Sequence, residues 1–128
     1  MGERDLTRLL RGLEPVRSPA PYGFAVWAGD VLPYAAFATV TEDEGLTVVA
    51  DLAGMRAAGL ISDPWARISL TVHSDLAAVG LTAAFAGALA EAGISCNVIA
   101  GFHHDHLFVQ WDRRCEALDV LTGLARDA

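Results

Sequence analysis

One order of predicted elements, between Arg67 and Leu124, limits what this chain can fold into. Apolar and polar residues alternate from Arg67 to His73, which predicts a strand with one buried face. The helix that follows carries its apolar residues on one stripe and ends at Gly93, a residue that favours a left-handed cap. Two further strands, over 94–100 and 106–111, and a last helix beginning at Asp112 complete the order strand–helix–strand–strand–helix.

This order predicts an α+β, ferredoxin-like unit with an antiparallel sheet and helices on one face. Such a unit needs one more strand than this half of the chain supplies. An unpaired strand edge readily accepts another strand. We therefore expect the missing strand to come from the N-terminal half or from a second subunit.

The N-terminal half has a less regular pattern. Apolar spacing predicts a short helix over 5–12, and prolines then interrupt the chain. Beyond them the sequence predicts a strand over 22–27, a hairpin of strands 35–41 and 46–50 around an acidic turn, and a helix over 51–58 capped by Asp51. Ser62-Asp63-Pro64 is the most linker-like point, so we expect one unit over residues 1–62 and a second over 63–128.

The charge of the chain disfavours a nucleic-acid partner. Its net charge is −7, and the chain contains no lysine, so every side chain that carries a full positive charge at pH 7 is an arginine. An acidic surface repels phosphate backbones. No apolar run reaches the ~18–20 residues of a membrane-spanning helix, and no secretory signal is visible. We expect a cytoplasmic protein without nucleic-acid or membrane partners, in which Cys96 and Cys115 are thiols on the core side of their elements.

The segment from Val79 to Val98 contains a glycine, an amphipathic helix, the tripeptide Ala92-Gly93-Ile94 and a strand, in that order. This pattern resembles that of ACT domains. The segments 71–76 and 104–109 are similar to a bacterial subgroup of small ACT-like proteins without assigned activity, and 41–49 is a looser match in the first half.

The resemblance implies two ACT-like units fused in one chain. ACT domains generally bind amino acids or similar small effectors where two units meet, and they regulate an enzyme or a transporter. The implied partners are therefore an amino-acid-like effector, a second copy in a homodimer, and a regulated enzyme or transporter. The resemblance also points to His73–Leu81 and Ser95–Val98 as the ligand site.

The loop before the helix also has a physical case as a ligand site. Ser74 or Asp75 can cap the helix, and the free N–H groups of a helix start favour a carboxylate. Gly80 lets a ligand approach the backbone, and Asp75 can meet an ammonium group. Ordinary helix capping explains the same residues, and this alternative stays open. The candidate ligand-binding residues are His73, Ser74, Asp75, Leu76, Val79, Gly80, Leu81 and Asn97.

The segment His103-His104-Asp105-His106 has the residue types of a metal site. Neighbouring strand residues point to opposite faces, which argues against a tight site, and a polar hairpin tip explains the same residues. Adjacent residues such as His73-Ser74-Asp75 cannot readily align as a hydrolytic triad, and no nucleotide-binding or nucleophile motif is present. We predict no metal, no cofactor and no catalysis.

The favoured hypothesis is a non-catalytic regulatory protein that binds an amino-acid-like effector. A ligand that binds one arrangement of the units more tightly shifts the population toward it. One alternative is a structural adaptor that recruits a partner protein through its sheet edge or a helix face. Another is a metal-dependent role centred on His103 to His106.

Overall fold

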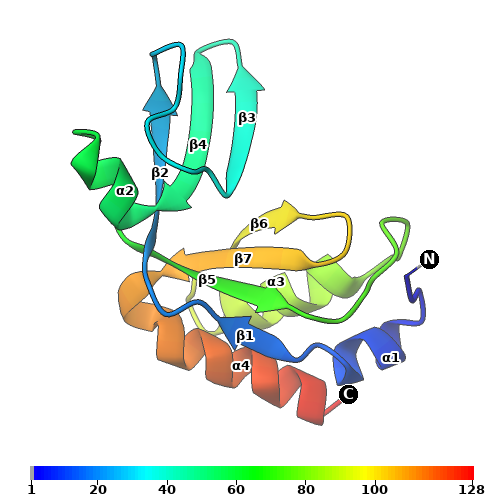
Figure 1. Cartoon of the computed structure of the whole chain (residues 1–128). Coiled ribbons are helices and arrows are strands. Elements are labelled where there is room, and N and C mark those ends of the chain that lie inside the picture. The colour runs from blue at the N-terminus through cyan, green and yellow to red at the C-terminus, as the bar shows by residue number, and fades with distance from the viewer. Residues whose placement is uncertain (1) are drawn as a thin grey trace. The chain divides into compact units, whose positions relative to one another are not determined.

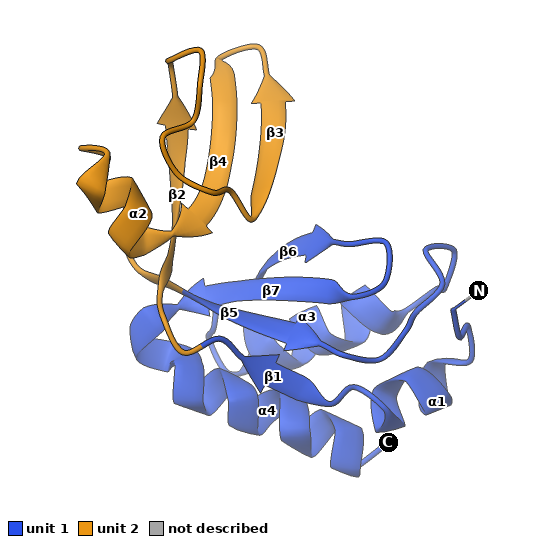
Figure 2. Ribbon diagram, in the orientation of Figure 1, with its two compact units in different colours: residues 1–18, 66–128 blue, residues 19–65 orange. Residues whose placement is uncertain are grey.

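The computed structural model describes residues 2–128, which divide into two compact units. The first unit joins the chain up to Ser18 with Ala66–Ala128, and the second is Pro19–Trp65 (Figure 2). Among the described residues, no helix is long and apolar enough to cross a membrane.

The first unit is a sheet with helices packed on one face (Figure 1). Its strands follow the spatial order β1, β5, β7, β6. This arrangement confirms the predicted α+β fold with an antiparallel sheet. The elements are α1 (Leu6–Arg11), β1 (Pro15–Arg17), β5 (Trp65–Leu70), α3 (Leu81–Glu91), β6 (Asn97–Ala100), β7 (Asp105–Gln110), a 3-10 turn η1 (Trp111–Arg113) and α4 (Arg114–Arg126).

The strand missing from the second half of the sequence is β1. It pairs antiparallel with β5, with Pro15 opposite Leu70 and Arg17 opposite Ile68. The N-terminal half therefore completes the sheet, one of the two sources that we expected. The division into ACT-like units over residues 1–62 and 63–128 stays a prediction. Packing divides the chain differently, because α1 and β1 lie with the second half.

The core of the first unit lies between the sheet and its helices. Helix α3 buries Leu81, Phe85 and Leu89 on one stripe, close to the stripe that the sequence predicts. Gly93 adopts the expected left-handed backbone, with a φ of 74°. The core also contains Leu9, Leu13, Ala66, Ile68, Leu70, Ile94, Leu107, Val109, Ala117 and Leu121.

Two expectations for the C-terminal helix are wrong. Asp112 does not cap it, because the chain first makes the 3-10 turn that contains this residue and α4 begins at Arg114 without a side-chain cap. Cys115 is exposed in the first turn of α4, whereas Cys96 is partly buried against the core as expected. Burial raises the pKa of the Cys96 thiol.

The second unit is an antiparallel three-stranded sheet with a short helix. Strand β4 pairs with β2 on one side and with β3 on the other, and the predicted hairpin is the β3–β4 pair. Asp51 accepts a hydrogen bond from the Ala53 N–H and caps the helix as predicted. Val48, Ala50 and Met55 form its small core. The elements are β2 (Tyr22–Trp27), β3 (Ala38–Glu42), β4 (Gly45–Asp51) and α2 (Leu52–Ala57).

The substitution Leu9→Ala tests whether the N-terminal helix belongs to the first core. Leu9 is fully buried in that core, so we expect the free energy of unfolding to fall by about 2–5 kcal/mol. Thr7→Ala is the matched control, since Thr7 is exposed on the same helix and its loss should change stability by less than about 0.5 kcal/mol. Urea denaturation measures both, and equal midpoints for the two variants would contradict this packing.

Candidate ligand pocket

A pocket of about 360 Å³ opens in the first unit where β5 ends. Three segments form its walls: the start of the chain, the loop after β5 and the turn between β6 and β7. Its volume falls at the small end of the range for ligand pockets, which suits a metabolite of amino-acid size. The lining residues are Gly2, His73, Ser74, Asp75, Leu76, Phe102 and His103.

The start of the chain pairs with the loop after β5 as a short parallel bridge between Glu3 and Ser74. The Glu3 N–H donates to the His73 carbonyl at 2.9 Å, and the Asp75 N–H donates to the Glu3 carbonyl at 3.0 Å. A Cβ atom at residue 2 would lie 2.3 Å from the Asp75 nitrogen, so glycine is required at this position. Gly2 is not among the residues predicted from the sequence, because no local pattern reveals a contact between segments so far apart in the chain.

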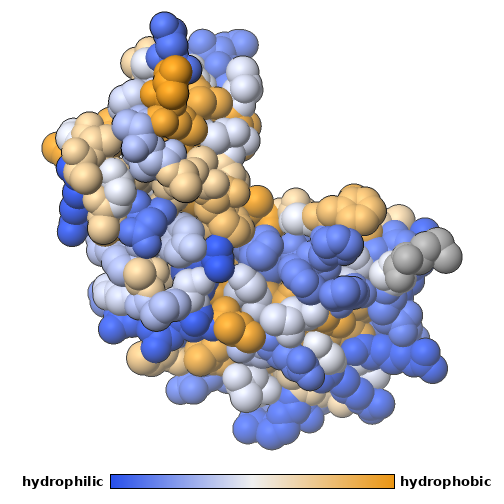
Figure 3. Space-filling view, in the orientation of Figure 1, coloured by the Kyte–Doolittle hydropathy of each residue, from blue (hydrophilic) through white to orange (hydrophobic). Residues whose placement is uncertain are grey.

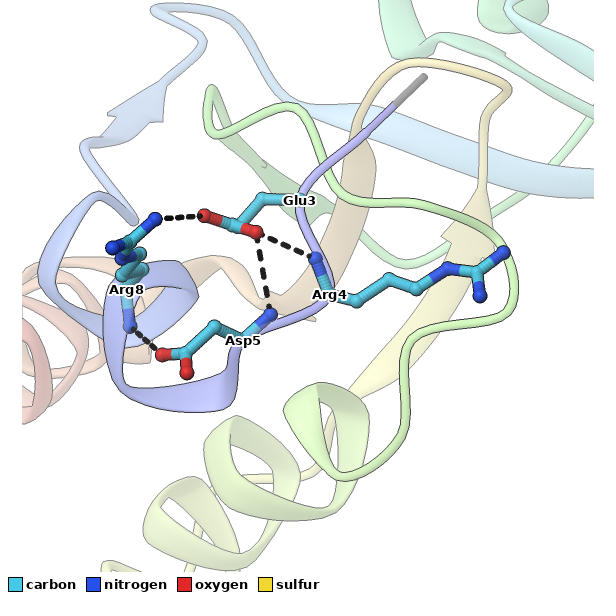
Figure 4. A network of polar contacts seen from close by, with 4 residues as sticks. All are labelled: Glu3, Arg4, Asp5 and Arg8. Carbon is cyan, nitrogen blue, oxygen red and sulfur yellow. Dashed lines mark hydrogen bonds and ion pairs between the residues drawn. The ribbon is translucent and has the colours of Figure 1, made fainter.

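A polar network holds this start of the chain onto α1 (Figure 4). The Asp5 side chain caps the helix by accepting from the Arg8 N–H at 3.0 Å. The Glu3 carboxylate accepts from the Arg4 backbone at 3.0 Å and from the Arg8 guanidinium at 3.4 Å. The backbone N–H groups of Arg4 and Asp5 lower the pKa of Glu3, so this carboxylate stays charged and the segment stays anchored.

Asp75 organises the loop rather than the helix that follows. Its carboxylate accepts from the Ala77 N–H at 2.7 Å and lies 3.2 Å from the Arg4 Nε. Helix α3 begins only at Leu81, where the preceding residue is Gly80 with a φ of 97° and no side chain caps the N–H groups. The expectation that Ser74 or Asp75 caps this helix is therefore wrong. The Asp75 carboxylate accepts from the N–H of a turn that begins at Asp75, several residues before the helix.

The turn between β6 and β7 brings two rings to the pocket. The Gly101 N–H donates to the His104 carbonyl at 2.9 Å and closes the turn. Phe102 and His103 lie at its tip, with ring centroids 5.1 Å apart in an edge-to-face arrangement. The centroid of the His103 ring lies 5.7 Å from that of the His73 ring, and both residues line the pocket. A ring-bearing turn thus faces the loop after β5.

The other histidines of the predicted metal segment make contacts within the protein. The His104 ring lies 4.7 Å from that of His73. His106 Nδ1 lies 2.8 Å from the Ser69 hydroxyl, and burial, Arg67 and His104 lower the pKa of His106. Burial raises the pKa of Asp105. Across residues 2–128, no group of three or more His, Cys, Asp or Glu side chains is placed to hold a metal ion.

Half of the predicted site residues meet in the pocket. His73, Ser74, Asp75 and Leu76 line it together. The others lie outside its lining: Val79 is exposed, Gly80 lies beneath the Leu6 side chain, Leu81 is buried in the core and Asn97 is exposed on β6. Ligand binding by all eight residues stays a prediction.

Comparison with known proteins shows which family the chain matches. One family model described as an ACT domain matches residues 1–67, and a second ACT domain model matches residues 60–123. The chain belongs to the ACT domain family. This result confirms the resemblance seen in the sequence.

Two solved structures share the fold of this ACT domain protein. One is a Vibrio cholerae protein of unknown function, described as a possible transport protein, with 45% identity and a TM-score of 0.80 over 88% of this chain and 89% of that one. The other is an Agrobacterium tumefaciens protein with 19% identity and a TM-score of 0.69 over 83% and 84% of the two chains, which shows the fold alone. No curated protein matches the chain.

The substitution Gly2→Ala should detach the start of the chain from the loop after β5. The added Cβ would overlap the Asp75 nitrogen, so we expect faster hydrogen exchange at the Asp75 amide. Gly87→Ala is the matched control, because a Cβ there meets no heavy atom within 4 Å and alanine favours a helix. Unchanged exchange at Asp75 in Gly2→Ala would show that the bridge does not depend on this glycine.

Asp75 gives the protein a pH dependence of known sign. The Ala77 N–H and Arg4 lower its pKa below the ordinary value of 3.8, so its contribution to stability is present above pH 3.8 and is lost as the pH falls through the folded pKa. A carboxyl titration by NMR should place the Asp75 midpoint below 3.8, and Arg4→Gln should raise it. A midpoint at 3.8 or above in the unaltered protein would contradict the hydrogen bonds described.

Proposed function

We propose that this chain is a non-catalytic regulatory protein that binds an amino acid or a closely related metabolite in the pocket at the end of β5. The observation that carries the proposal is the convergence of His73, Ser74, Asp75 and Leu76 in one cavity with the start of the chain and the β6–β7 turn. A cavity that joins charged, polar and apolar groups is the usual form of a small-molecule site.

The polar groups of the pocket match the two charges of an amino acid. The Asp75 carboxylate keeps lone pairs beyond those used by the Ala77 N–H and Arg4, and it can accept from an ammonium group. The rings of His73 and His103 each carry at least one N–H, which can donate to a carboxylate. Arg4 positions Asp75 and has no place in the pocket lining.

Family membership supports the same function. ACT domains typically bind small-molecule effectors, and the Vibrio cholerae protein with 45% identity is described as a possible transport protein. We propose that the effector regulates a transporter or an enzyme and that the protein acts as a homodimer. The effector would act by binding one arrangement of the protein more tightly than another.

A thermal-shift screen of the twenty amino acids tests this function. A ligand present at 100 times its Kd adds about 2.7 kcal/mol to the stability of the folded state, which should raise the Tm by several degrees. The shift should disappear in Asp75→Asn and persist in Asp43→Asn, whose carboxylate belongs to the exposed turn between β3 and β4. If no amino acid changes the Tm, the proposed function is wrong.

A further inference from the structure

We propose that the pocket selects amino acids whose side chain is aromatic. This inference rests on the proposed function and adds the class of ligand to it. The observation that carries it is one part of the pocket wall, where the His103 ring contacts the rings of His73 and Phe102 and where Leu76 lines the same cavity. Binding the ammonium and carboxylate groups of an amino acid does not require three neighbouring rings in the pocket.

The three rings form a continuous corner. The Phe102 and His103 centroids lie 5.1 Å apart with an angle of 87° between the ring planes, and the His73 and His103 centroids lie 5.7 Å apart with an angle of 34°. Both distances fall in the 4.5–7 Å range in which aromatic pairs attract each other. The corner therefore presents both ring faces and ring edges. The ring of a ligand can contact it either edge-to-face or with its plane tilted against a ring of the corner.

The apolar side chains of this wall are largely in contact with water. Phe102 is 78% exposed and Leu76 is 66% exposed, although both line the cavity. Figure 3 shows apolar surface at the edge of the first unit, near the turn that Figure 1 draws between β6 and β7. An aromatic side chain would cover this surface, and the burial of apolar area would contribute to affinity.

The charges around the pocket disfavour the other side-chain classes. An acidic side chain would approach the Asp75 carboxylate and be repelled by it, because hydrogen bonds and Arg4 hold the pKa of Asp75 below its ordinary value and keep it charged at neutral pH. A basic side chain would compete with the ligand's own ammonium group for Asp75, which is the one carboxylate among the described lining residues. An aliphatic side chain would bury some apolar area without the ring-to-ring contacts. An uncharged aromatic side chain avoids both conflicts at Asp75 and gains the ring-to-ring contacts.

Hydrogen bonds hold the backbone segments that carry these rings before any ligand arrives. Gly101 closes the turn that carries Phe102 and His103, and a Cβ at residue 101 would lie 2.8 Å from the His104 carbonyl oxygen. His73 is held through its own carbonyl, which accepts from the Glu3 N–H. A prearranged backbone loses little conformational entropy on binding, so less of the energy of the ring contacts is offset.

Isothermal titration calorimetry of the full chain tests the inference. The probes are L-phenylalanine, L-tyrosine and L-tryptophan, compared with L-leucine, L-glutamate and L-arginine. We expect at least one aromatic amino acid to bind about tenfold more tightly than L-leucine, and L-glutamate and L-arginine to bind more weakly still. Phe102→Ala should weaken binding of that aromatic ligand by about tenfold, while Val31→Ala, an equally exposed side chain of the second unit, should not change it.

The outcomes separate this inference from the proposed function. Phe102 is exposed, so its substitution should leave the Tm of the free protein unchanged and a loss of affinity cannot come from unfolding. If L-leucine, L-glutamate or L-arginine binds as tightly as the aromatic probes, or if Phe102→Ala keeps full affinity, the aromatic selectivity is wrong and the proposed function stands. If no amino acid of the twenty binds, both are wrong.

Discussion

The structure depends on backbone pairing between the start of the chain and its second half. Strand β1 pairs with β5 and completes the sheet of the first unit, and Glu3 pairs with Ser74 at the pocket. The whole second unit, Pro19–Trp65, lies between these partners in the sequence. Loop-closure entropy grows only slowly with loop length, so a folded unit can occupy this connection at modest cost to the pairing. Without the pairing, β5 would have an open edge and the pocket would lose one wall.

The regular part of this fold could be predicted because its signals are local. The stripe of α3, its left-handed glycine at position 93 and the alternation along β5 are all visible within short windows of sequence. The sequence left two possible sources for the missing strand, the N-terminal half and a second subunit. It could not decide between them, because β1 has only three residues and its partner strand is far away in the sequence. Gly2 is the extreme case. Glycine is required there only because the backbone of a segment distant in the sequence packs against it.

The candidate site was predicted in part for the same reason. A strand end followed by polar residues identifies the loop from His73 to Leu76, and these residues line the cavity. The prediction extended too far along the chain because it placed the helix directly after Asp75. Asp75 instead closes a turn through the Ala77 N–H, and α3 begins at Leu81. Ser, Asp and Gly are suited both to helix caps and to turns, so their types alone do not distinguish the two.

The construction of the pocket also suggests how a bound effector would act under the proposed function. Its walls are joined by two backbone hydrogen bonds of Glu3 and by the contact of Arg4 with Asp75, all at the start of the chain. An effector that touches both Gly2 and the loop after β5 binds the paired arrangement more tightly than a detached one. Differential affinity of this kind is the condition for a population shift. The segment that an effector would order continues directly into α1 and β1. Effector binding would therefore stabilise the pairing of β1 with β5, on which the first unit depends.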